Sequence, residues 1–183
     1  MHIELKIPNE LRLEARSHAE KRIEYEYDRF HLATEQRISM ITIGTLGQLV
    51  FKRYLEQMDI PFSFQYQYGI YDDFDFQIDQ KIVEIKTSGY RKDSEWNRLN
   101  LIYNASQLEA ALNKNFYCSV QIFVNNYDKV NKLFNYKKCD TAIIAGWASI
   151  KDIAEYPPKY LPLGRAHLVP LQDLTPLSKL FTP

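Results

Sequence analysis

Several features that would place this 183-residue chain in a specialised class of protein are missing from its sequence. It has two cysteines, Cys118 and Cys139, which lack zinc-ligand spacing, and a chain of this length needs no disulfide to support its core. The longest run without charge, from Ile38 to Phe51, falls short of the ~20 residues of a transmembrane helix. No secretory leader is recognisable, so we expect a cytoplasmic protein with no membrane partner.

Charge of one sign is also missing, because 23 lysines and arginines balance 23 aspartates and glutamates. A strongly basic domain would point to nucleic acid on charge alone, whereas here any affinity for DNA must come from local patches. The four histidines are scattered, and neither a phosphate-binding glycine loop nor a GxSxG elbow is present. These absences argue against zinc-finger, P-loop and serine-hydrolase chemistry.

A hydrophobic fraction of 45% and an aromatic fraction of 14% predict a folded chain with a hydrophobic core. Apolar residues from Leu11 to Phe30 recur every three or four positions, which predicts an amphipathic helix of roughly 25 residues. We therefore divide the chain into an N-terminal helical arm, residues 1–37, and a domain at residues 38–183. The arm packs either on its own domain or on a second subunit of a homodimer, and the sequence leaves both open.

Hydrophobic periodicity predicts the order of elements in the domain. We expect helices at 38–58, 94–112 with a break near Asn104, and 128–136, and strands at 62–70, 73–78, 81–87, 116–124, 141–148 and, at an edge, 166–169. This order predicts an α/β fold with a mixed central β-sheet of four to five strands flanked by helices.

The residues 79–80 form a two-residue turn between the second and third strands, which sets their register. In that register Asp75 lies opposite Glu84 and Asp73 opposite Lys86, and like charges in opposed positions destabilise a hairpin. Mg²⁺ would offset the repulsion, and Lys86 could then reach a water or a phosphate. An exposed hairpin in which Lys86 merely pairs with Asp73 or Glu84 shows the same alternation, so spacing leaves both interpretations open.

Asp75, eight intervening residues and Glu84-Ile85-Lys86 together resemble the PD-(D/E)xK signature of restriction-endonuclease-like nucleases. Phe74 stands where a proline often precedes the aspartate. The segment Gly44-Thr45-Leu46-Gly47-Gln48 is similar to the helix before the strands in that family, with Gln48 where a glutamate is frequent. The predicted helix, strand, helix, strand order after Lys86 is also similar.

The resemblance implies a restriction-endonuclease-like core and a Mg²⁺-dependent endonuclease acting on DNA, with Mn²⁺ as a substitute metal. It implies that Asp75 and Glu84 bind the metal with the Ile85 backbone carbonyl. Lys86 would position the attacking water or stabilise charge on the phosphate, and Gln48 would orient a water. Gln48 brings no negative charge, which argues against a second tightly bound metal, and a glutamine on the exposed side of a buried helix is its structural alternative.

Two other functions remain open. The first is a member of the same superfamily that binds nucleic acid or a protein partner without cutting, such as an accessory factor in mobile-element excision. The second is an unrelated α/β interaction protein whose partner surface is the aromatic strand at 62–68 and the long arm helix.

Overall fold

The structure is a computed structural model that describes residues 2–25, 31–64, 75–90, 98–162 and 164–181. Its strands are β1 (Ile3–Lys6), β2 (Ser63–Phe64), β3 (Phe76–Ile78), β4 (Lys81–Gly89), β5 (Asn100–Asn104), β6 (Cys118–Val124), β7 (Tyr127–Asp128), β8 (Leu133–Phe134), β9 (Thr141–Ser149), β10 (Lys159–Leu161) and β11 (Gly164–Pro170). The α-helices are α1 (Asn9–Arg22), α2 (Thr34–Gln57), α3 (Ala105–Asn113) and α4 (Ile150–Glu155). Short 3₁₀ helices are η2 (Tyr136–Lys138), η3 (Leu171–Asp173) and η4 (Leu177–Leu180).

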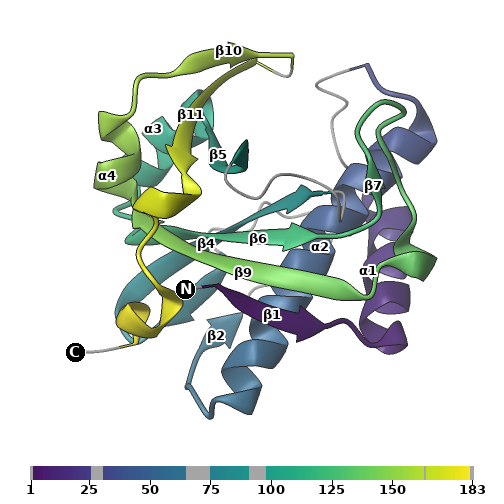
Figure 1. Cartoon of the computed structure of the whole chain (residues 1–183), viewed down its shortest axis with the longest axis horizontal. Helices are drawn as coiled ribbons and strands as arrows, with labels where there is room; N and C mark the ends of the chain where they lie inside the picture. The colour runs from purple at the N-terminus through teal and green to yellow at the C-terminus, as the bar shows by residue number, and fades with distance from the viewer. Residues whose placement is uncertain (1, 26–30, 65–74, 91–97, 163, 182–183) are drawn as a thin grey trace.

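The main sheet has six strands in the order β1-β9-β6-β4-β3-β2 (Figure 1). It is mixed, because β4 and β6 run parallel while every other neighbouring pair is antiparallel. A separate three-stranded sheet has the order β10-β11-β5, and β7 and β8 form a small hairpin. The α/β class is therefore confirmed, while the expected four to five strands become six because β1 adds an edge strand. Of the strand predicted at 62–70, β2 is described, and residues 65–70 lie outside the described ranges.

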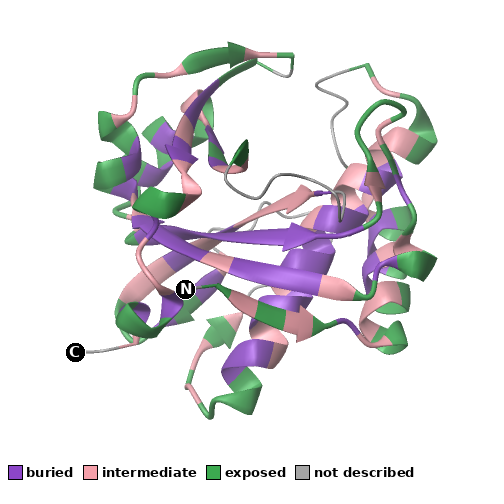
Figure 2. Ribbon diagram, viewed as in Figure 1, coloured by how far each residue is buried: buried purple, intermediate pink, exposed green. Residues whose placement is uncertain are grey.

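Both faces of the main sheet are covered, and all seven residues of β6 are buried (Figure 2). On one face Val120 and Trp147 belong to a core that includes the apolar residues of α2. On the other face Ala148 packs with residues of β5, α3, α4 and β11. Since neighbouring residues of a strand point to opposite faces, the main sheet contributes side chains to two separate cores, one on each face.

The helix α2 covers the first face with fully buried Leu46, Phe51 and Leu55. At its start the backbone N–H of Ala33 donates a hydrogen bond to Gln36 Oε1, 3.1 Å away. The backbone of α2 approaches β4 closely at Gly47, where an added Cβ would lie 2.8 Å from Cβ of Thr87. Within the described residues, neither α2 nor any other helix is long and apolar enough to cross a membrane.

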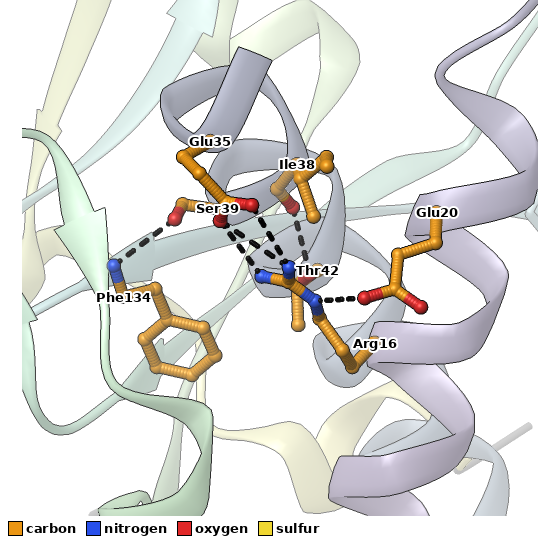
Figure 3. Close-up of polar contacts among 7 residues, drawn as sticks. All are labelled: Arg16, Glu20, Glu35, Ile38, Ser39, Thr42 and Phe134. Atoms are coloured by element: carbon orange, nitrogen blue, oxygen red, sulfur yellow. Dashed lines mark hydrogen bonds and ion pairs between the residues drawn. The ribbon is translucent and has the colours of Figure 1, made fainter. Parts of the chain in front are cut away.

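The N-terminal segment packs on its own chain. Arg16 of α1 pairs with Glu20 at 2.6 Å and with Glu35 of α2 at 3.2 Å, as Figure 3 shows. Ala15 and Ala19 are fully buried beneath it. The helix ends at Arg22, earlier than expected, and residues 26–30 lie outside the described ranges. Of the two packing alternatives the structure shows the intrachain one, and a homodimer through this helix stays a prediction.

The segment 100–104 was predicted to be helical, and this prediction is wrong. Residues 100–104 form β5, which pairs antiparallel with β11 along its whole length. Leu101 and Tyr103 are buried while Ile102 between them is exposed, which is the period of a strand. The helix begins only after Asn104, whose side chain accepts a hydrogen bond from the Ser106 N–H at 2.9 Å. Residues 94–97 lie outside the described ranges.

The helix predicted at 128–136 is also absent. The carboxylate of Asp128 accepts hydrogen bonds from the N–H groups of Val130 and Asn131, at 2.9 and 3.2 Å, and this local turn competes with helix formation. Lys132 then adopts a left-handed conformation, with φ of 55°. The chain reverses into the β7–β8 hairpin. The predicted strands at 116–124 and 141–148 are confirmed as β6 and β9. The strand predicted at 166–169 is β11, but it is the middle strand of its sheet and not an edge.

Candidate functional site

The predicted register of the β3–β4 hairpin is confirmed over three pairs. Phe76 pairs with Val83, Gln77 with Ile82 and Ile78 with Lys81. Asp79 has a φ of 53°, as a tight two-residue turn requires. The strand pairing ends at Phe76 and Val83, however, because β3 begins at Phe76 and not at residue 73. Asp75 therefore directly precedes the strand, and Asp73 lies outside the described residues.

The Asp75 carboxylate takes the place of a strand partner at this point. Its Oδ2 accepts a hydrogen bond from the backbone N–H of Ile85 at 2.7 Å, and its Oδ1 accepts one from Gln48 Nε2 at 2.6 Å. Gln48 is half-buried on α2, so it is not the surface glutamine of the structural alternative. The N–H and C=O of one strand residue point to the same edge, so the Ile85 carbonyl faces the side on which Asp75 lies.

The environment of Asp75 disfavours its negative charge. Burial and, second to it, the neighbouring Glu84 raise the pKa of the Asp75 carboxyl to about 6, against the opposing effects of the Ile85 N–H, Lys86 and Gln48. The two carboxylates are thus close enough to interact as like charges. A group with this environment either carries a proton near neutral pH or keeps its charge beside a cation.

Glu84 lies on the opposite side of β4 from α2 and is held at both oxygens. The Lys86 ammonium donates to Oε1, and the Tyr103 hydroxyl donates to Oε2. Lys86 Nζ also donates to Gln107 Oε1 at 3.0 Å and lies 4.5 Å from the centre of the Tyr103 ring. The Glu84 and Lys86 side chains are 17% and 16% exposed, so the ion pair is mostly buried but still in contact with solvent.

The sequence interpretation misses Tyr103, because it predicts a helix at this position. Gln107 is exposed on α3, and its Oε1 also accepts a hydrogen bond from Lys86. The alternation of Leu101, Ile102 and Tyr103 is a strand signal that could have revealed the tyrosine's direction. Nothing in the local sequence indicates that Gln107 reaches Lys86, because that contact depends on how α3 packs beside β4.

The donor set fits a hard divalent cation. Two adjacent carboxylates and one backbone carbonyl are oxygen ligands, and Mg²⁺ commonly binds through one or two carboxylates while it keeps several waters. Among the described residues no group of three or more His, Cys, Asp and Glu side chains is positioned to hold a metal ion. A metal here would therefore rest on Asp75, Glu84 and the Ile85 carbonyl, with water completing its shell.

The Lys86–Glu84 ion pair is also what the structural interpretation of the hairpin predicts. The geometry separates the two interpretations better than the spacing does, because a simple surface hairpin would not recruit Gln48, Tyr103 and Gln107 from three other elements. The function of the protein is inferred from this geometry. Known proteins add nothing to it, since no protein-family model, no curated protein and no solved structure matches this chain.

Proposed function

We propose that this protein is a Mg²⁺-dependent phosphodiesterase that cleaves DNA, with Asp75, Glu84 and Lys86 at its reaction centre. One observation carries the proposal: Asp75 and Glu84 lie close enough for Glu84 to raise the pKa of Asp75, and Lys86 contacts Glu84 directly. The similarity of these residues to the PD-(D/E)xK pattern gives the substrate class. A core like that of restriction endonucleases is part of the same proposal.

Each residue then has a distinct role. Asp75 and Glu84 would hold Mg²⁺ with the Ile85 carbonyl, and Gln48 keeps the Asp75 carboxylate in place from α2. When bound, Mg²⁺ supplies a Lewis acid for the phosphate and lowers the pKa of water. Lys86 would orient the attacking water or stabilise the charge that develops on the phosphate. Tyr103 keeps Glu84 from turning away from the site.

Cleavage of supercoiled plasmid in Mg²⁺ or Mn²⁺ tests the proposal. Asp75→Asn, Glu84→Gln and Lys86→Met should each lower the rate by on the order of 100-fold or more, because each removes a proposed metal ligand or the Lys86 ammonium. The matched control is Glu109→Gln, the same chemical change on the exposed face of α3, which should cleave at the wild-type rate. Equal rates in all five proteins would refute the assignment.

Metal binding can be measured without turnover. Calorimetric titration with Mg²⁺ should give heat with the wild type and with Glu109→Gln, and none with Asp75→Asn or Glu84→Gln. Mg²⁺ should also raise the melting temperature of the first two proteins only, since a ligand that binds the folded state stabilises it. Metal binding of equal strength in all four proteins would place the metal elsewhere.

A second function has one observation in its favour. All four carboxylate oxygens of Asp75 and Glu84 already accept hydrogen bonds from the protein, so the centre is complete without a cation. A protein that binds DNA without cutting it would fit this arrangement. It would shift DNA in a gel equally in EDTA and in Ca²⁺ and leave plasmid intact in Mg²⁺, whereas the nuclease requires cleavage.

A further inference from the structure

Two buried polar atoms lie on the same face of the sheet as Glu84 and Lys86 and have no hydrogen-bond partner among the described residues. They are Ser119 Oγ and Gln121 Oε1, both on β6, and both side chains are fully buried. A buried carbonyl oxygen without a donor costs free energy, and native proteins rarely keep one without a reason. Neither residue has a part in the proposed chemistry so far.

Strand register places the two atoms beside the site. In the parallel pairing of β4 and β6, Ser119 is the neighbour of Glu84 and Gln121 is the neighbour of Lys86. Neighbouring strands lie ~4.8 Å apart, so the Lys86 and Gln121 side chains leave the sheet side by side. On its other side Gln121 faces Gly146 of β9, and Leu174 and Thr175 pack against this glycine.

The Gln121 amide is oriented by its own strand. Its Nε2 donates to the Ile122 carbonyl at 2.8 Å, beside the register shift between β6 and β9, and this bond leaves Oε1 as the free end. Lys86 is the neighbouring group that carries hydrogen-bond donors. An ammonium has three N–H donors, and in the structure Lys86 directs them to Glu84 Oε1, to Gln107 Oε1 and toward the Tyr103 ring.

We propose that Gln121 is a positioning residue for Lys86, whose ammonium moves from Glu84 to Gln121 Oε1 when Glu84 is engaged by a cation. The physical reason is competition for one oxygen. A ligand cation would take Glu84 Oε1 and repel the Lys86 ammonium, which then needs another acceptor in a protected site. Gln121 is the adjacent neutral acceptor, and its oxygen is already desolvated.

Ser119 does not serve this purpose, although it shares the burial and the missing partner. Its short side chain lies beside Glu84, an anion that needs no further acceptor. Ser119→Ala is therefore the matched control: same strand, same face, two residues away.

A melting-temperature cycle tests the Lys86–Gln121 contact without any metal. Glu84→Met removes the anionic partner of Lys86, which mimics an engaged Glu84. In the wild type, Gln121→Met should change the melting temperature only slightly, because it removes the Nε2–Ile122 hydrogen bond together with an oxygen that has no donor. In the Glu84→Met background, Gln121→Met should lower the melting temperature by ~2–4 °C, since there Gln121 Oε1 accepts a hydrogen bond from the Lys86 ammonium. If Glu84→Met does not fold, Glu84→Ala replaces it, because alanine also offers Lys86 no acceptor.

The control Ser119→Ala should have the same effect in both backgrounds. If Gln121→Met shifts the melting temperature equally in the two backgrounds, the contact does not form and the inference is overturned, whether or not the protein cleaves DNA. This measurement thus separates the inference from the proposed function.

The role in turnover rests on the proposed function. There Gln121→Met should lower kcat by on the order of tenfold while DNA affinity in Ca²⁺ stays at the wild-type value, as for other residues that orient a reacting group. Gln121→Glu keeps the acceptor oxygen and should retain more of kcat than Gln121→Met. Unchanged kcat in Gln121→Met would overturn the role in turnover even if the melting cycle supports the contact.

Discussion

The two faces of the main sheet are built from different kinds of side chain. On the α2 face the central strands present Val83, Ile85, Val120 and Ile122, all part of one apolar core. On the β5–α3 face the same strands present Glu84, Lys86, Ser119 and Gln121. Burying polar groups costs free energy that burying apolar groups does not. The comparison indicates that the apolar α2 face contributes more to stability than the β5–α3 face, which buries polar side chains.

The aromatic cluster around Phe76 shows how the apolar face is stabilised. Phe76 is fully buried and meets Phe51 of α2 edge to face, with ring centres 5.0 Å apart. Its other ring neighbours are Phe62 and Phe64, at 5.8 and 4.7 Å. On the polar face one large buried ring is Tyr103, which adds a hydrogen bond to Glu84.

The largest effect should come from Phe76→Ala, which opens a cavity on the apolar face. We expect a loss of ~3–5 kcal/mol in the free energy of unfolding. Tyr103→Phe on the polar face keeps the ring and loses one hydrogen bond to a carboxylate, and should cost ~1–2 kcal/mol. Urea unfolding of both variants measures the difference. If Tyr103→Phe is the more destabilising of the two, the comparison between the faces is wrong.

The next effect concerns the pH dependence of stability through Asp75. The pKa of Asp75 is about 6 in the folded protein and has its ordinary value of 3.8 in the unfolded chain, so the folded state binds this proton more tightly. Stability contributed by Asp75 is therefore present below about pH 4 and is lost as pH rises toward 6, by up to ~3 kcal/mol.

Asp75→Asn should remove this loss and raise stability at pH 7. Melting curves of the wild type, Asp75→Asn and Glu109→Gln between pH 4 and 7 measure it. A wild-type slope that Asp75→Asn leaves intact would show that Asp75 keeps an ordinary pKa.

A pair of glycines on α2 tests how tightly the apolar face is packed. A methyl group at Gly47 would overlap Thr87 of β4, whereas one at Gly44 meets nothing within 4 Å. Overpacking costs ~1–3 kcal/mol, and the helix propensity of alanine returns up to ~1 kcal/mol. Gly47→Ala should therefore destabilise the protein by ~1–2 kcal/mol, while Gly44→Ala should stabilise it by up to ~1 kcal/mol. Chemical denaturation of both variants compares them, and stabilisation by Gly47→Ala would contradict the close approach.

The smallest effect should come from the surface contact between α1 and α2. Glu35→Gln weakens an ion pair whose glutamate side chain is 64% exposed, so we expect less than ~0.5 kcal/mol in the free energy of unfolding. The loss should shrink further at high salt, where exposed charges are screened. Denaturation at low and high salt measures it, and a loss above ~1 kcal/mol would mean that α1 is held by this pair more than by its buried alanines.

Local patterns in the sequence predict the parts of the fold whose hydrogen bonds are made by neighbours in the chain. The hairpin register follows from strict alternation and a two-residue turn at Asp79, so Glu84 and Lys86 could be assigned to one face before the structure was known. The helix α2 and the buried strands β6 and β9 follow from long apolar patterns for the same reason.

Partners distant in the chain decided the rest. Residues 100–104 form a strand because β11 supplies their hydrogen bonds, and this pairing turns Tyr103 toward Glu84. Gln121 lies beside Lys86 only because β6 pairs with β4 in parallel, 35 positions along the chain (121 − 86). The sequence alone thus determined the class of fold and the acidic hairpin. Only the tertiary structure decided which side chains surround that hairpin, because packing between distant segments leaves no local pattern.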